Sequence, residues 1–394
     1  MPAVTIPCCP TAIPIDDASD SDSAKENVTT THLPLFKSMT IPKGTTKIEN
    51  PFSVAGIPKL EKFVNLDHLP DILVVYDKGD ITNRSAGSRP VYYKRAYPKA
   101  ENVVPGNPRR AALFLDTANC IDKGRRSSVY QAPFIATLGP KGAPRKHVLV
   151  AAKVANNTCR CHQLLRDEAR GFSTFPDQFF DDTNASPWAL GPEYAPLVEH
   201  LPAMRPRYLL SWAARMNPKP TPQEMVPPIA PRFYGYYVPI ESETSTRSLA
   251  RSHRNCEDFQ NSNCDVSHWP KSIMLMEDCG RRINPGTLPL RHRVQCLQLV
   301  ERMHLLGFSH GHARASNMLV QPGPLSLPQE KRSMDTPSFR LISLGRWRGV
   351  FHPLALESAQ GAMRAFVKGR ENDVFFALHE LRLISAPTSH VEKE

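Results

Sequence analysis

The sequence predicts an α+β fold, in which a β-rich N-terminal part precedes a reduced, mainly helical C-terminal part. Short runs of β-branched and aromatic residues, bounded by Gly, Asn, Ser or Pro, recur from residue 71 to residue 154 and are typical of strands. The clearest helix comes much later, at Leu288–Leu306, where apolar residues form one broad face and Gly307 ends the segment.

The composition indicates an intracellular globular protein with long loops. Of its 394 residues 41% are hydrophobic and 22% charged, which suffices for a large core, whereas 38 prolines indicate extended loops. The net charge of +11 favours an anionic partner, and nine irregularly spaced cysteines favour reduced thiols. There is no long apolar run and no secretory leader pattern, so the sequence predicts a cytoplasmic or nuclear protein without a membrane span.

Segments of low hydrophobicity separate the predicted domains. Residues 1–66, rich in Pro, Ser, Thr and Asp, are expected to form a disordered tail. Residues 67–280 contain most strands, interrupted by a Pro-rich insert at about 173–230 and a polar loop at about 242–270. Residues 281–394 form the reduced C-terminal part.

Two further helices are expected, over Cys161–Phe172 and Asn372–Leu383, because apolar residues recur there at helical spacing. The strands are expected at Asp71–Tyr76, Pro90–Arg95, from Ala111 onward, Ser128–Phe134, His147–Val154, Arg232–Val238, Ser272–Glu277, Met318–Val320 and Phe339–Leu344.

Residues that can carry chemistry follow these elements in a set order. Gly124 lies in a turn between two strands, Lys153 is on the following strand and Glu168 is on the following helix. A later strand ends in Met276-Glu277-Asp278-Cys279-Gly280, and the long helix leads into His310-Gly311-His312, with Asn317 five residues on. A further strand ends in Ser343-Leu344-Gly345.

This order resembles the protein-kinase-like superfamily, in particular its compact members common in fungal genomes, over about residues 115–346. The resemblance implies a bilobal fold with a β-rich N-lobe, a reduced and mainly helical C-lobe, and an ATP-binding cleft. Lys153 would contact the ATP phosphates and Glu168 would hold it, although the alternative for Lys153 is a solvated lysine at a strand edge.

The resemblance also implies how the rest of the nucleotide would be contacted. Gly124 and Val129 would belong to a degraded phosphate-covering loop, where Lys123, Arg125 and Arg126 would add attraction for phosphate. The alternative is an ordinary basic hairpin turn. Met276, Glu277 and Cys279 would border the adenine, or else simply end a strand.

Two residues depart from the family pattern at the positions that matter for catalysis. His312 replaces the aspartate that deprotonates the acceptor, and Ser343 replaces the main Mg²⁺ ligand, while Asn317 is retained. Losing a positioned base alone costs a factor of about 10²–10⁴ in rate. The sequence therefore predicts a pseudokinase with a regulatory or scaffolding role and an unidentified protein partner, binding ATP with weak or no Mg²⁺ dependence. The alternative is a residual ATP-dependent phosphotransferase acting on a protein or a small molecule.

Other site types have less support in the sequence. A zinc site at Cys159, Cys161 and His162 would need distant ligands such as Cys256 and Cys264 at irregular spacing. Pairs of arginines occur without interleaved aromatic residues, which does not favour nucleic-acid binding. No Gly-x-Ser-x-Gly turn follows a strand, so a serine hydrolase is not supported.

Overall fold

The structure is a computed structural model, and it describes residues 50–83, 90–99, 108–140, 142–176, 179–180, 227–240, 270–349 and 359–384. The chain divides into two units, residues 1–49 and 50–394, and every described residue belongs to the second. None of the helices within the described ranges is long and apolar enough to cross a membrane.

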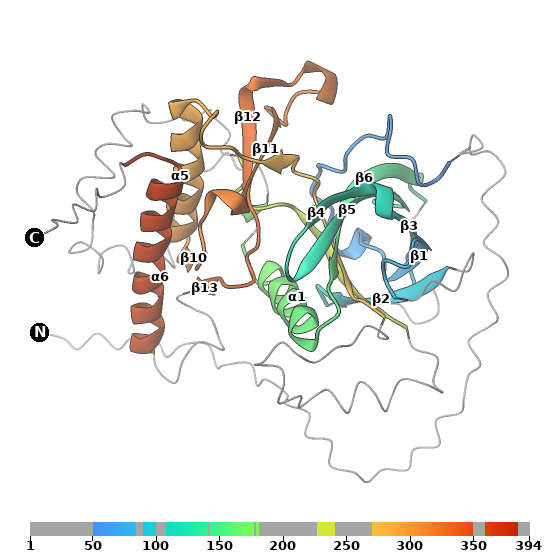
Figure 1. Cartoon of the computed structure of the whole chain (residues 1–394). Coiled ribbons are helices and arrows are strands. Elements are labelled where there is room, and N and C mark those ends of the chain that lie inside the picture. The colour runs from blue at the N-terminus through green and yellow to red at the C-terminus, as the bar shows by residue number, and fades with distance from the viewer. Residues whose placement is uncertain are drawn as a thin grey trace, which may run out of the picture. The chain divides into compact units, whose positions relative to one another are not determined.

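Seven strands of the second unit, between Ile72 and Met276, form a closed β-barrel (Figure 1). Around the barrel the strands follow the order β3-β1-β2-β7-β8-β6-β5, and β3 closes the ring by pairing with β5. A hairpin strand, β4, extends from β5. The bounds are β1 Ile72–Lys78, β2 Val91–Tyr97, β3 Arg110–Asp116, β4 Cys120–Lys123, β5 Ser127–Ala136, β6 Lys146–Ala155, β7 Phe233–Pro239 and β8 Ile273–Met276.

The closed barrel shows that the bilobal protein-kinase-like fold expected from the sequence is wrong, and with it the pseudokinase and fungal-type assignments. The described residues contain three α-helices, too few for a mainly helical C-lobe. The motif order misled because it depends on local segments, whereas closure depends on the parallel pairing of β1 with β3 and the antiparallel pairing of β3 with β5. Pairings between segments distant in sequence leave no periodic signal along the chain.

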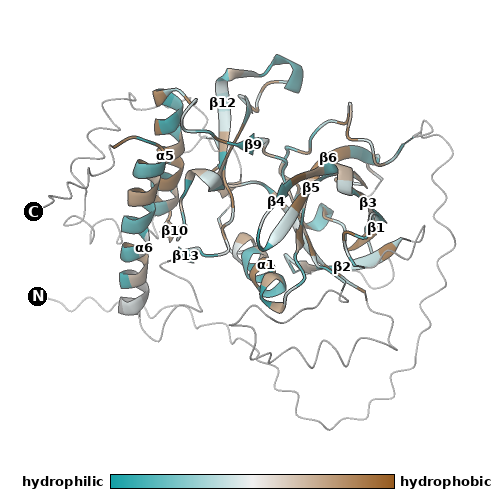
Figure 2. Cartoon of the chain, viewed as in Figure 1, coloured by the Kyte–Doolittle hydropathy of each residue, from teal (hydrophilic) through white to brown (hydrophobic). Residues whose placement is uncertain are grey.

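The strands themselves lie close to their predicted positions, because short runs of β-branched, apolar and aromatic residues mark them in the sequence. On β6, Val148, Val150, Ala152 and Val154 point into the barrel core. The alternate residues Ala151 and Ala155 belong to a second core, outside the barrel. Figure 2 shows the resulting hydrophobic character of the barrel strands.

The second core is built where helices and short sheets pack against the barrel. Helix α1 (Cys159–Phe172) covers β6 and β7, and α5 (Leu290–Leu305) packs on α6 (Ala359–Glu380). The remaining strands are β9 Arg281–Arg282, β10 Phe308–Ser309, β11 Met318–Gly323, β12 Ser333–Leu341 and β13 Arg348–Gly349, which form the sheets β12-β11-β9 and β10-β13.

All three predicted helices are present, with different ends. Helix α5 stops just before Gly307, whose φ of 82° suits the predicted stop. Helix α6 begins thirteen residues before the predicted Asn372 (372 − 359). Its sequence is apolar on more than one face, with Phe375 56% exposed, so periodicity alone does not show how far the helix extends.

Several predicted loop segments fall only partly within the described residues. Residues 1–49, 181–226 and 241–269 lie outside them, so most of the predicted tail, Pro-rich insert and polar loop is not described. The stretch 50–66 of the predicted tail packs on the barrel instead: Leu60 and Val64 are buried, and the Leu60 amide donates a 2.8 Å hydrogen bond to the Leu149 carbonyl.

Candidate ligand-binding site

A cavity of about 1210 Å³ lies where the barrel meets the segments that follow β8. Its wall is formed by the β4–β5 turn, β6, α1, the segment after β8 and the loops around residues 312–317 and 342–346. It is lined by every residue that the sequence analysis assigned to the site: Gly124, Val129, Lys153, Glu168, Met276, Glu277, Cys279, His312, Asn317 and Ser343. The roles predicted for these residues stay predictions, but their convergence on one cavity is a property of the fold.

The centre of the site is an ion pair between Lys153 on β6 and Glu168 on α1. Lys153 Nζ lies 2.6 Å from Glu168 Oε2, and the two side chains are only 12% and 7% exposed. Glu168 Oε1 is buried and makes no hydrogen bond within the described part of the chain. An unsatisfied buried acceptor costs about 1–3 kcal/mol, so a ligand that donates a hydrogen bond here would be favoured.

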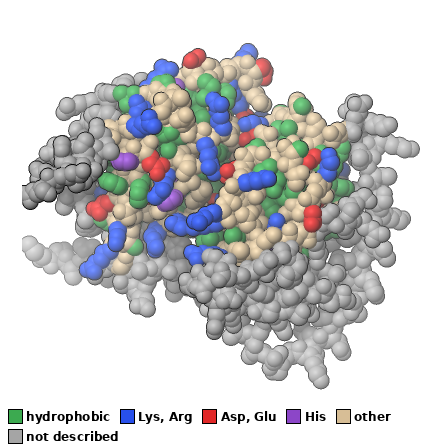
Figure 3. All heavy atoms as spheres, viewed as in Figure 1, with side chains coloured by type: hydrophobic (Ala, Val, Ile, Leu, Met, Phe, Trp, Pro, Cys, Tyr) green, Lys and Arg blue, Asp and Glu red, His purple; other side chains and the backbone are tan. Residues whose placement is uncertain are grey.

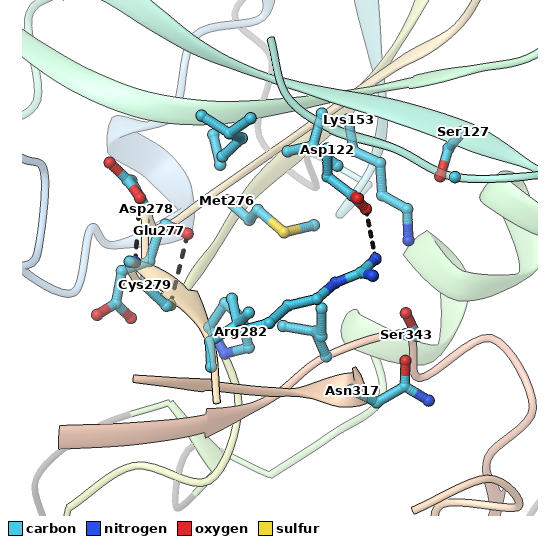
Figure 4. A pocket seen from close by; sticks show the side chains of 18 of the residues that line it. Asp122, Ser127, Lys153, Met276, Glu277, Asp278, Cys279, Arg282, Asn317 and Ser343 are labelled. Carbon is cyan, nitrogen blue, oxygen red and sulfur yellow. Dashed lines mark hydrogen bonds and ion pairs between the residues drawn. The ribbon is translucent and has the colours of Figure 1, made fainter. Parts of the chain in front are cut away.

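The opposite side of the cavity is a length of backbone after β8, at Glu277–Cys279 (Figure 4). The Glu277 carboxylate is buried and engaged elsewhere, 3.3 Å from the Arg340 guanidinium. Asp278 Oδ2 lies 3.3 Å from Lys59 Nζ. Burial raises the pKa of the Cys279 thiol well above its ordinary value, which keeps it protonated. A ligand therefore meets mainly backbone groups along this wall.

His312, Asn317 and Ser343 border the cavity from the side of the C-terminal elements. Asn317 Nδ2 donates a 2.9 Å hydrogen bond to the His312 carbonyl. The pKa of His312 is lowered by partial burial and by the positive charges of Arg314, Arg346 and Arg126, while Glu380 acts in the opposite direction. The lowered pKa favours the neutral form of the imidazole.

Ser343 occupies a strained backbone position. Its φ of 63° lies in the left-handed region, which a residue with a side chain adopts at a cost of about 1–2 kcal/mol. The Trp347 amide closes the loop that follows Ser343 by donating a 3.1 Å hydrogen bond to the Leu344 carbonyl. Strain of this kind persists only where the surrounding contacts fix the loop.

The loop that carries His312 is fixed by a carboxylate that the sequence analysis did not identify. Asp373 on α6 is fully buried and accepts hydrogen bonds from the backbone amides of His310 (2.6 Å), Gly311 (3.2 Å) and Ala313 (3.2 Å). His310 is fully buried too, with Nε2 2.9 Å from the Ile342 carbonyl. Nothing in the local sequence around Asp373 distinguishes it from an exposed helical aspartate.

A second pair that the sequence analysis missed reaches across the cavity. Arg282 on β9 extends to Asp122 on β4, with Nη2 2.8 Å from Oδ2 (Figure 4). The two residues are 160 positions apart, so no motif links them. Their ion pair joins the barrel to the three-stranded sheet at the site.

Metal binding has little support in the described ranges, where no group of three or more His, Cys, Asp or Glu side chains is placed to hold an ion. Cys159 and Cys161 are buried at the start of α1, and neither belongs to a disulfide. Burial, with Lys271 and Arg166 nearby, lowers the pKa of His162 to about 4. The distant cysteines that a zinc site would need, Cys256 and Cys264, lie outside the described residues.

No protein-family model matches the sequence, and no curated protein matches it either.

Proposed function

We propose that this cavity binds a nucleotide such as ATP, with weak or no dependence on Mg²⁺, and that the protein has a regulatory or scaffolding role. The observation that supports this most is the buried Lys153–Glu168 pair facing a wall of backbone groups across one cavity. A lysine held by a carboxylate presents a fixed positive charge to phosphate, and backbone groups can contact the edge of a base. A volume of about 1210 Å³ accommodates a ligand of that size.

Weak dependence on Mg²⁺ follows from the side chains on the C-terminal side of the cavity. Asn317 and Ser343 offer neutral oxygens, whereas Mg²⁺ prefers carboxylate oxygens and gives up its waters reluctantly. The carboxylates that line the cavity are already paired with cations: Asp122 with Arg282, Glu168 with Lys153, Asp278 with Lys59 and Glu277 with Arg340.

The test is a calorimetric titration of the pure protein with ATP, in EDTA and then in Mg²⁺. We expect binding in both buffers, and we expect Lys153→Met combined with Glu168→Gln to weaken it roughly tenfold or more, because a hydrogen bond to a charged group is lost. Changing both residues avoids leaving the Glu168 carboxylate buried without a partner. Lys146→Met, at the exposed start of the same strand, is the matched control and should bind ATP normally.

Two results would contradict the proposal: no binding of ATP in either buffer, or binding that requires Mg²⁺. A second candidate function, an ATP-dependent phosphotransferase, has one supporting observation, the neutral His312 imidazole in the cavity. Phosphate transfer from ATP by the unmodified protein, lost in His312→Ala, would favour that candidate.

A further inference from the structure

The charges that line the cavity do not balance. Seven cationic residues line it, against four carboxylates. All four carboxylates form ion pairs, and three of these pairs are with cations that also line the cavity. The other four lining cations are arginines for which the described chain provides no ion-pair partner: Arg125, Arg126, Arg281 and Arg346. Unpaired charge gathered at a partly enclosed cavity costs folding energy, which an anionic ligand would offset.

Three of these arginines come from two turns whose backbones are fixed by hydrogen bonds. Arg125 and Arg126 lie in the β4–β5 turn, where the Gly124 amide donates to the Ser127 carbonyl at 2.9 Å. Asn156 holds this turn from β6, with its amide donating to the Arg126 carbonyl at 3.0 Å and its side chain to the Gly124 carbonyl at 2.9 Å. The backbone of these arginines is thus preorganised.

The third arginine, Arg346, approaches from the C-terminal elements. Its carbonyl is so close to Gly311 that a Cβ at that position would lie 2.6 Å from it. The contact with Gly311 fixes the Arg346 backbone, just as Asn156 fixes the β4–β5 turn. Figure 3 shows several basic side chains gathered near the middle of the face in view.

The charges of the two turns are close enough to influence each other. The pKa of Arg126 is lowered first by partial burial and then by the positive charges of Arg346, Arg160 and Arg125. Helix α1 starts nearby, with Arg160 and no acidic residue in its first turn. The partial positive charge of a helix N-terminus usually attracts acidic residues, and here it adds to the cationic character instead.

We propose that Arg125, Arg126 and Arg346 form a polyphosphate subsite, in which their guanidinium groups neutralise the phosphates in place of a divalent cation. Guanidinium groups bind phosphate oxygens in pairs of parallel hydrogen bonds and keep their charge at every physiological pH. A Mg²⁺ ion would be repelled by the same three charges. The inference deepens the proposed function and rests on it only for the nucleoside part of the ligand.

The experiment titrates inorganic triphosphate, and separately adenosine, into the full chain in EDTA by calorimetry. We expect triphosphate to bind, Arg126→Gln with Arg346→Gln to weaken it at least about tenfold, and Arg126→Lys with Arg346→Lys to restore part of the affinity. Arg364→Gln with Lys368→Gln removes two exposed charges from α6 as the control, and should leave binding unchanged. Adenosine affinity should be the same in the three variants and in the unmodified protein.

The outcomes separate the two proposals. Adenosine binding without triphosphate binding, or triphosphate binding that the glutamine variant retains, would overturn the subsite and leave nucleoside binding in place. A third outcome is triphosphate binding that depends on Arg126 and Arg346, with no binding of adenosine and no higher affinity for ATP than for triphosphate. It would support the subsite and overturn the proposal that the cavity binds a nucleotide. No binding of either compound would overturn both.

Discussion

Gly311 shows why a small residue is needed in the loop that carries His312. Its φ is 73°, and a Cβ there would lie 2.6 Å from the Arg346 carbonyl. Alanine would therefore destabilise the folded state in two ways. A left-handed backbone costs about 1–2 kcal/mol, and displacing Arg346 costs about 1–3 kcal/mol more. We expect Gly311→Ala to lower the free energy of unfolding in urea by the sum of these costs.

Gly56 is a closely matched control for this substitution. Its φ is 72°, but no atom lies within 4 Å of a Cβ built there. Gly56→Ala should therefore cost only the backbone part, and the difference between the two variants measures the contact with Arg346. Equal destabilisation by both would show that this contact does not hold the Arg346 turn.

The site residues were predictable from sequence to the extent that their neighbours in the chain mark them. Lys153 and Glu168 stand on a clear strand and a clear helix, and their spacing brings them together at 2.6 Å. Arg125 and Arg126 were visible as a basic turn, and Arg346 as half of a basic pair. The ion pair between Asp122 and Arg282 was not predictable, because it depends on how β9 is placed against β4.

At the scale of elements, Asp373 connects α6 to α5 and to the loop at His310. His304 on α5 has Nε2 3.3 Å from the Asp373 carboxylate, which also accepts the three backbone amides. In Asp373→Asn, an NH₂ group replaces one of the two acceptor oxygens. This donor would then face the backbone N–H donors of the loop and could not accept their hydrogen bonds. We expect a loss of at least about 1–3 kcal/mol in the free energy of unfolding.

The same variant should change the dependence of stability on pH. Burial alone would raise the pKa of Asp373, but the interactions with His304 and His310 and the Gly311 amide lower it below the ordinary 3.8. A depressed carboxyl pKa stabilises the fold above the unfolded value, and this stability is lost as the pH falls through the folded value. Melting temperatures between pH 5 and pH 2 should therefore fall less steeply in Asp373→Asn.

Glu371→Gln, an exposed carboxylate on the same helix, serves as the control for both measurements. It should keep the stability and the acid sensitivity of the unmodified protein. An Asp373→Asn protein as stable as the control would contradict the role assigned to Asp373 in holding the loop.

The elements themselves were predicted better than their arrangement, because periodicity reports burial and not partners. On β6 and β8 both faces are buried, so these strands read as apolar runs and were identified correctly. The parallel pairing of β1 with β3 and the closure of β3 onto β5 have no counterpart in the spacing of apolar residues. A familiar order of motifs was therefore compatible with an unexpected fold.

On the scale of the whole molecule, the two cores share strands, and this predicts that they unfold together. In β8, Ile273 and Leu275 belong to the barrel core, whereas Met274 and Met276 belong to the core that contains α5. If either core melted alone, these strands would have to stay ordered with one apolar face exposed to water, at a cost of roughly 25 cal/mol for each Å².

We therefore expect one cooperative transition, measurable by native-state hydrogen exchange in increasing denaturant. Phe134→Ala removes a fully buried ring from the barrel core and should cost about 3–5 kcal/mol. The most protected amides of α5, which contact only the other core, should lose as much protection as those of β1. Met303→Ala, fully buried in the core of α5, is the reciprocal variant and should lower the protection of β1 and α5 equally. If each variant instead weakened only the amides of its own core, the barrel and the helices would be separate folding units, and the strands they share would not couple them.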